Sequence, residues 1–223
     1  MFVRTDPEAA PHKGISCLLV DLRNTPGITM KTDQHMDGLW AFNIVWLEDA
    51  RLPKDAVLGD VNNGFKVILE TLNFERPFSG LCIAYAKRVL DDLIEYCKQT
   101  TRNGKPLAED QVIRRKLADC ATQLEVGRMM AYHVVWMQGQ GLPTPKESNM
   151  IKLYGIESTK RVYDTAMQIL GAHSQLTENS KWVPLKGEIN YLYMRAIGLM
   201  SAGGSLEIMR NTIAGAGLRM PKG

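Results

Sequence analysis

Residues 64–97 read GFKVILETLNFERPFSGLCIAYAKRVLDDLIEYC, and their apolar positions recur every three or four residues. This spacing predicts a long helix with one face toward a core. Pro77 lies inside the stretch and has no backbone N–H, which leaves the carbonyl of Asn73 without its usual partner, so we expect a kink there. The predicted core-facing residues are Phe65, Ile68, Leu72, Ser79, Ile83, Ala86, Leu90, Leu93 and Cys97.

Glu75 falls on the same predicted face, three residues after Leu72. An unpaired carboxylate is costly in an apolar environment. The pattern is therefore compatible with two interpretations. Glu75 is either a buried side chain satisfied by its neighbour Arg76 or by a distant arginine, or it is a functional carboxylate.

Composition describes an ordinary globular chain of 223 residues, 45% hydrophobic and 23% charged, with a formal net charge of +3. The basic residues are dispersed, which argues against nucleic acid or an anionic membrane as the partner. No apolar run is long enough for a membrane span, and no export signal is visible. The four cysteines form no CxxC pair and the four histidines show no ligand spacing. We expect reduced thiols, a cytoplasmic protein and no metal site.

The chain divides into a strand-rich part and a helical part. Residues 1–60 contain short β-rich runs, 14–21 and 41–47, separated by Pro/Gly turns. Residues 61–223 keep a helical period, and long helices with short connections form bundles. The prediction is an α+β, mainly α fold: a partial antiparallel β-domain (1–60) followed by a C-terminal four-helix bundle (61–223). The expected helices cover about 62–100, 109–138, a stretch ending at 170, 189–199 and 205–216.

Seven segments in this order resemble the flavin-dependent acyl-CoA dehydrogenases. They are Gly14-Ile-Ser-x-Leu-Leu-Val-Asp21, Pro26-Gly27-Ile28, Leu52-Pro53 through Leu58-Gly59, Gly64-Phe65 with Glu75-Arg76, Asn103-Gly104-Lys105-Pro106-Leu107, Gln168-Ile169-Leu170-Gly171, and Gly203-Gly204-Ser205-Leu206-Glu207-Ile208-Met209-Arg210-Asn211. The resemblance covers the second half of the family's middle β-domain and its C-terminal helical domain. The sequence contains no match to the family's N-terminal helical domain. It also lacks the Thr-Glu-Pro-type and Trp-x-Thr-type segments that line the flavin ring in the family, so an N-terminally truncated form is expected.

The resemblance implies a catalytic base. In this family a carboxylate removes the α-proton of an acyl-CoA thioester while the β-hydrogen leaves as hydride to the flavin. The base stands at one of two positions, which correspond here to Gly203 and Glu75. Gly203 has no side chain, so the resemblance assigns the base to Glu75, in the arrangement of the isovaleryl- and long-chain-specific enzymes. Arg76 is then either a cation that shapes the substrate site or a simple ion-pair partner of Glu75.

The resemblance also implies contacts with FAD. Gln168 and Gly171 match a loop that reaches the flavin of a neighbouring subunit, and Gly204, Ser205 and Glu207 match a segment that meets the adenosine diphosphate part. Thr100 stands where the family has a phosphate-binding arginine, and Arg102 could replace it from two residues later. The other implied partners are an acyl-CoA substrate, an electron-transfer flavoprotein or similar acceptor, and further copies of the chain in a homodimer or homotetramer.

Three functions are compatible with these residues. The first is an acyl-CoA dehydrogenase of fatty acid metabolism, of undefined acyl length. The second is a catalytically silent assembly subunit or remnant, which the missing flavin-ring segments favour. The third is an oxygen-using flavoenzyme of a related family; Glu75 disfavours the flavin monooxygenases among these, because they do not need this base.

Overall fold

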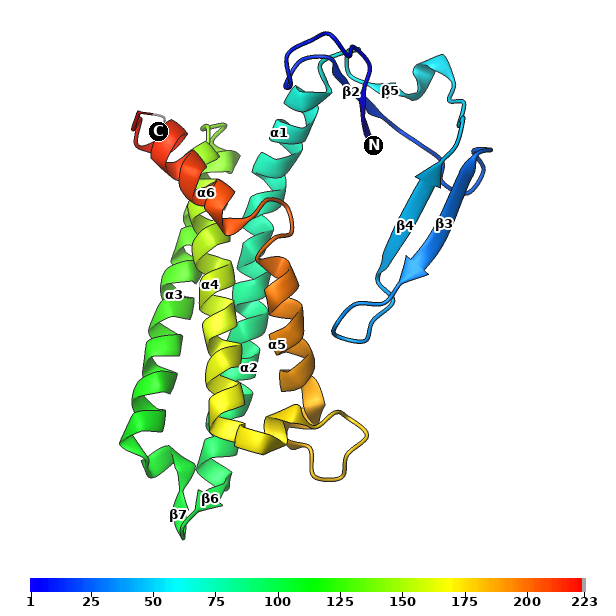
Figure 1. The fold of residues 1–223 in the computed structure, drawn as a ribbon. Coiled ribbons are helices and arrows are strands. Elements are labelled where there is room, and N and C mark those ends of the chain that lie inside the picture. The colour runs from blue at the N-terminus through cyan, green and yellow to red at the C-terminus, as the bar shows by residue number, and fades with distance from the viewer. Residues whose placement is uncertain (222–223) are drawn as a thin grey trace. The chain divides into compact units, whose positions relative to one another are not determined.

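A computed structural model describes residues 1–221 of the chain, which form two compact units, Met1–Phe74 and Glu75–Gly223. Figure 1 shows their elements, and the fold is mainly helical with short antiparallel strands, as predicted. No helix in this described part is both long enough and apolar enough to cross a bilayer.

The first unit contains two small antiparallel sheets and a helix. One sheet has the order β1-β2-β5, formed by Phe2–Arg4, Ile15–Leu18 and Val57–Leu58. The other is a hairpin of β3 (Ile28–Asp33) and β4 (Phe42–Leu47). Helix α1 (Gly64–Glu75) starts against β2, where a side chain at Gly64 would lie 2.5 Å from the backbone nitrogen of Cys17.

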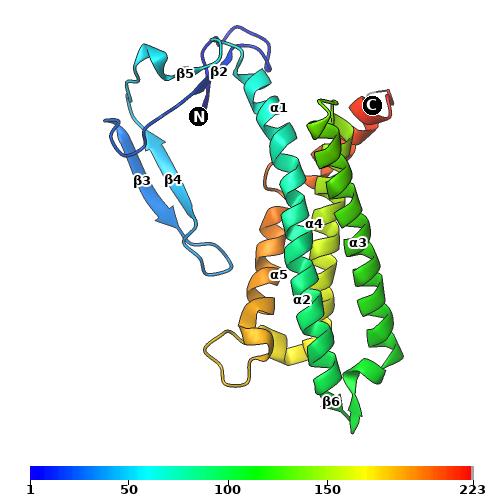
Figure 2. The ribbon, with the colours of Figure 1, turned by 180° about the vertical axis from the view of Figure 1, so that it is seen from behind.

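The second unit is the predicted bundle of four helices, α2 (Ser79–Gln99), α3 (Gln111–Gly139), α4 (Pro145–Leu170) and α5 (Glu188–Leu199). A hairpin of β6 (Thr101–Arg102) and β7 (Lys105–Pro106) connects α2 to α3. Helix α4 packs against α2, α3 and α5, and Figure 2 shows α2, α3 and α4 running side by side. A short helix, α6 (Leu206–Thr212), follows α5 and also packs on α4.

The bundle core is formed by the predicted apolar faces. Ile83, Ala86, Leu90, Leu93 and Cys97 of α2 are all buried, as are Ile113, Leu117, Cys120, Leu124 and Val134 of α3. Each large aliphatic side chain in such a core contributes about 1.5–3 kcal/mol relative to an exposed one. All four cysteines are free thiols.

Helix α4 departs from the expected amphipathic pattern because it lies among other helices. Met150 is 37% exposed, whereas Ser148, Asn149 and Lys152 are buried. A central helix buries more than one face, so its polar residues cannot all reach solvent and a single apolar stripe no longer identifies the interior.

Candidate functional site

The Glu75-Arg76 pair lies where α1 ends and a 3-10 turn, Arg76–Phe78, begins. The turn confirms the predicted disruption at Pro77. The prediction that Glu75 faces the core is wrong, because Glu75 is exposed and Arg76 is only 9% exposed. Glu75 is the last residue of α1, a helix in which only Gly64 is buried, so the predicted apolar face that Glu75 shares with Leu72 does not lie in a core.

The Glu75 carboxylate faces the loop between α5 and α6. Gly203 in this loop has φ +63°, a left-handed conformation that glycine adopts without steric cost. A Cβ atom added to Gly203 would lie 3.2 Å from Oε1 of Glu75 and 2.8 Å from Nζ of Lys152. Two residues 128 positions apart in the sequence therefore approach the same point, together with a lysine that the sequence analysis did not select.

Lys152 is a buried cation on α4, only 5% exposed. Its ammonium group donates a hydrogen bond to the carbonyl oxygen of Ala202, immediately before Gly203. Burial lowers the pKa of Lys152, the Glu75 carboxylate opposes this shift, and the Arg76 guanidinium adds to it. Lys152 was missed because it lies off the predicted apolar stripe; its apolar neighbours Ile151 and Leu153 were the only signal in the sequence.

Arg76 is the second buried cation beside Glu75. Its Nε atom is buried and has no hydrogen-bond partner among the described residues. Burial lowers the pKa of Arg76, and the Glu75 carboxylate counteracts that shift. The arrangement thus brings one exposed carboxylate together with two poorly solvated cations.

The start of α6 adjoins this cluster. Gly204 has φ +101°, and a side chain there would meet Met209. The Ser205 hydroxyl accepts a hydrogen bond from the backbone N–H of Ile208, so Ser205 is the N-cap, as predicted. Glu207 follows in the first turn, where its own backbone N–H and Ser205 lower the pKa of its carboxyl group. This end of the bundle therefore presents an ionised carboxylate next to Ser205.

Arg102, Gln168 and Gly171 form a separate cluster. Arg102 on the β6–β7 hairpin donates a hydrogen bond of 3.1 Å to the carbonyl of Ile169, and Lys116 of α3 donates to the side-chain oxygen of Gln168. Gly171 ends α4 with φ +59°, and a Cβ there would meet nothing within 4 Å.

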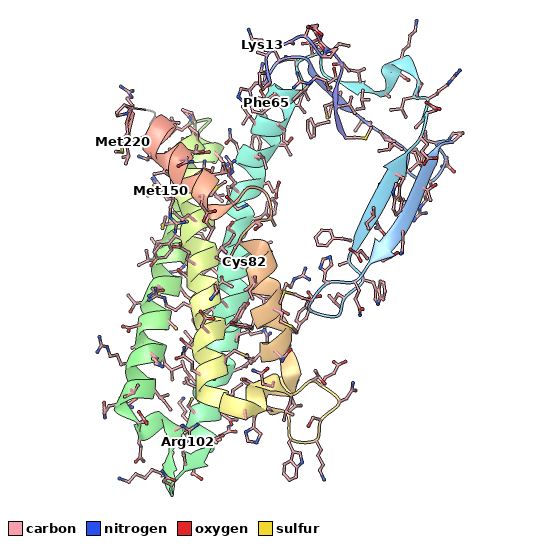
Figure 3. All side chains as sticks on the ribbon, in the orientation of Figure 1. Lys13, Phe65, Cys82, Arg102, Met150 and Met220 are labelled. Atoms are coloured by element: carbon pink, nitrogen blue, oxygen red, sulfur yellow. The ribbon has the colours of Figure 1, made fainter. Side chains whose placement is uncertain are left out.

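The two clusters lie at opposite ends of the bundle. Residues 152 and 168 of α4 belong one to each cluster, and the helical rise separates them by roughly 24 Å. In Figure 3, Met150 of α4 and Arg102 lie toward opposite ends of the bundle. The six predicted cofactor-binding residues of one chain therefore do not form a single site.

Two pockets open on the bundle. The first has a volume of about 350 Å³ and lies between α2, α4 and α5; it is lined by Leu81, Cys82, Tyr85, Thr159, Tyr163, Tyr191, Leu192, Arg195, Ala196 and Leu199. We call it the α2–α4–α5 pocket. The second, of about 320 Å³, includes Gln168 and is otherwise lined by Asp164, Met167, Gln175, Asn190, Tyr193 and Met194. Within the described residues, no group of three His, Cys, Asp or Glu side chains could hold a metal ion.

Comparison with known proteins identifies relatives along the whole chain. Residues 62–218 match the profile of the acyl-CoA dehydrogenase C-terminal domain. The human mitochondrial short-chain specific acyl-CoA dehydrogenase is 34% identical over 98% of this chain and 52% of its own length. The caffeyl-CoA reductase-Etf complex subunit CarC of Acetobacterium woodii is 32% identical over 80% of this chain and 47% of its own length.

Solved structures agree with these matches. The Tcur3481-Tcur3483 steroid ACAD superimposes with a TM-score of 0.90 and 29% identity, covering all of this chain and 56% of that chain. The chain spans about half the length of the curated relatives it matches.

Proposed function

The chain belongs to the acyl-CoA dehydrogenase family, and we propose that it is the C-terminal portion of a flavin-dependent enzyme that introduces an α,β double bond into an acyl-CoA thioester. Glu75 is the proposed base. In relatives that resemble it, the base stands either at the position of Glu75 or at that of Gly203, and this chain has a carboxylate only at the first.

The observation that carries the proposal is the convergence of Glu75 and Gly203. A side chain at Gly203 would start 3.2 Å from the Glu75 carboxylate oxygen. Carboxylates at either position would therefore reach the same part of a substrate, which explains how a family can exchange one position for the other. It supports Glu75 as the functional replacement for the residue that Gly203 lacks.

In the proposed reaction the Glu75 carboxylate accepts the α-proton of the thioester as the α,β double bond forms. FAD, when bound, takes up the β-hydrogen with its electron pair. Lys152 and Arg76 place positive charge beside Glu75. Lys152 also donates a hydrogen bond to the Ala202 carbonyl oxygen and so fixes the loop that contains Gly203.

The residues present fit the outer parts of FAD. Around Gln168, the cations Arg102 and Lys116 suit phosphate oxygens, and Gly171 leaves open space for a close approach. At the other end, the ionised Glu207 would repel phosphate and instead suits the hydroxyl groups of a ribose. Because these two groups lie at opposite ends of one bundle, we propose that they serve FAD molecules bound in different subunits.

The proposed partners follow from the same relatives. CarC is by name a subunit of a complex with Etf, which supports an electron-transfer flavoprotein as the electron acceptor. A homodimer or homotetramer would supply the second cluster to each FAD.

The first prediction tests Glu75 in a protein completed with the segment that precedes residue 1 in its relatives. Replacing Glu75→Gln keeps the size of the side chain but removes the proton acceptor, so flavin bleaching by acyl-CoA under anaerobic conditions should slow by well over the ~10²-fold typical of a lost general base. Flavin content should not change.

Glu70→Gln is the matched control, because Glu70 lies on the same helix, is exposed and is paired with Lys66 at 3.9 Å. Equal bleaching rates for the parent and Glu75→Gln would make Glu75 structural. A completed protein that holds flavin but does not bleach even with Glu75 intact would favour the alternative, a catalytically silent assembly subunit.

A further inference from the structure

Thr159 of α4 has a buried hydroxyl group with no partner. Its side chain is 2% exposed, and its Oγ1 atom makes no hydrogen bond to any described residue. Other threonines within helices of this chain behave differently: Thr71, Thr122 and Thr212 donate to the carbonyl four residues earlier, at 2.9, 3.0 and 2.9 Å. This back-bond is the usual solution for a helical threonine. Leaving a buried hydroxyl unpaired is costly, so Thr159 requires an explanation.

Thr159 is one of the residues that line the α2–α4–α5 pocket. The rest of that lining is largely apolar or aromatic, with Tyr163 and Leu192 buried. A volume of about 350 Å³ falls within the range of small-molecule sites, which are mostly apolar with a few polar groups that fix the ligand's orientation. Thr159 is such a polar group.

The pocket adjoins the segments that carry the proposed catalytic cluster. Cys82 follows Glu75 by seven residues, across the 3-10 turn, and Thr159 follows Lys152 by seven residues, roughly 10 Å along α4. Cys82, labelled in Figure 3, and Lys152 are close enough for each to shift the pKa of the other. On α5, Leu199 lines the pocket and lies just before the loop of Ala202 and Gly203. An acyl group whose α-carbon meets Glu75 can therefore extend into this pocket.

We propose that the α2–α4–α5 pocket binds the acyl group of the substrate, and that Thr159 recognises a hydroxyl or carbonyl oxygen carried by that group far from the thioester. This inference rests on the proposed function for the identity of the ligand as an acyl group. It adds the substrate class: a medium-sized, mainly apolar acyl group with an oxygen substituent, in place of a plain saturated chain. A site built to hydrogen-bond such a group discriminates against the analogue that lacks it, because its own polar atom then stays unpaired.

The test measures binding to the 223-residue chain by calorimetry, with decanoate and 10-hydroxydecanoate as probes of equal length. We expect 10-hydroxydecanoate to bind more tightly, although it is the less hydrophobic of the two. Thr159→Val, which keeps the shape, should weaken binding of 10-hydroxydecanoate roughly 5- to 10-fold, the effect of one hydrogen bond, and leave decanoate unchanged. Thr159→Ser should restore the preference and guards against a folding defect in the valine variant.

Thr165→Val is the matched control, since Thr165 is buried on the same helix but is bonded to Cys120 at 3.5 Å and does not line the pocket. Tighter binding of decanoate, equal effects of the two valine variants, or no binding of either probe would overturn the proposal. So would a preference for sebacate, which would assign recognition to Arg195. The binding assay involves no flavin and no Glu75 chemistry, so its failure is distinguishable from failure of the proposed reaction.

Discussion

At the scale of single residues, the candidate site combines one exposed carboxylate with two buried cations. Burying Lys152 and Arg76 costs free energy that an apolar residue in the same place would not. Lys152 offsets part of that cost by its hydrogen bond to Ala202 and its attraction to Glu75. A charge retained at such a cost supports a functional reason for Lys152, and its titration can be measured directly.

The second prediction concerns the pKa of Lys152, which burial lowers from the ordinary value of 10.5. Because Glu75 raises this pKa, Glu75→Gln should lower it further; Glu70→Gln should not. Between the folded-state pKa and 10.5, the unfolded chain binds more protons than the folded chain, so stability should rise with pH across this window. The checks are an NMR titration of the Lys152 amine and denaturation curves over the same pH range. A Lys152 pKa that is identical with and without Glu75 would show that the two groups do not interact.

At the scale of elements, Glu75 lies at the end of α1, immediately before the 3-10 turn that contains Pro77. The sequence predicted the disruption at Pro77. It did not predict the exposure of Glu75, because the periodic apolar positions of α1 are not buried and Gly64 is the buried residue of that helix. The faces of α2 and α3 were predictable because each of these helices has one buried stripe. The burial of Lys152 and of the other polar residues of α4 was not predictable, because a helix surrounded by neighbours no longer follows an amphipathic pattern.

Among the predicted cofactor residues too, local features could be predicted from the sequence, whereas contacts between distant segments could not. Ser205 was recognisable as a helix N-cap from local sequence, and the structure confirms it. The convergence of Glu75 with Gly203 was not visible in spacing, because it depends on how Glu75, α4 and the α5–α6 loop meet in three dimensions within the second unit. The unpaired Thr159 hydroxyl also has no sequence signal, since threonine in a helix ordinarily bonds to its own backbone.

The third prediction concerns an enzyme in which the carboxylate is moved from position 75 to position 203. In the completed enzyme with Glu75→Gln, adding Gly203→Glu should restore part of the flavin bleaching, because the new side chain starts 3.2 Å from the former carboxylate position. Recovery should be incomplete, and thermal stability should fall, because a non-glycine residue at φ +63° costs roughly 1–2 kcal/mol. Gly203→Ala imposes the same strain without a carboxylate. If Gly203→Glu bleaches no faster than Gly203→Ala, the two positions do not address the same atom.

At the scale of the whole molecule, the exposed face of α3 indicates assembly. Met129 and Trp136 are 55% and 58% exposed, and Val126, Tyr132 and Val135 lie beside them in the helix sequence with similar exposure. Met130 and Met137, on the same helix, are only partly exposed. An apolar helix face of this size is unusual for a monomer.

The fourth prediction is that the chain self-associates through this face. Light scattering at micromolar concentration should show a dimer or larger species, because association removes the apolar face from water. The double change Met129→Glu and Trp136→Glu should shift the population toward monomer, since charges at an interface core are costly. Lys87→Glu on α2, at an exposed ion pair, is the control. A monodisperse monomer for the unmodified chain would contradict the prediction.

The last prediction is that the 223-residue chain alone does not retain FAD. The residues proposed to face FAD fall into two clusters roughly 24 Å apart along α4, so one chain cannot apply both to the same FAD. The family's ring-lining segments were not found among the 223 residues either. We therefore expect the 223-residue chain, purified in the presence of FAD, to lose the cofactor on gel filtration even as an oligomer, and the completed protein to retain it. The absorbance spectrum of the protein peak is the measurement. A stable flavin spectrum on the 223-residue chain would mean that these residues suffice to hold FAD. That result would contradict the proposal that FAD also needs contacts from the family's ring-lining segments.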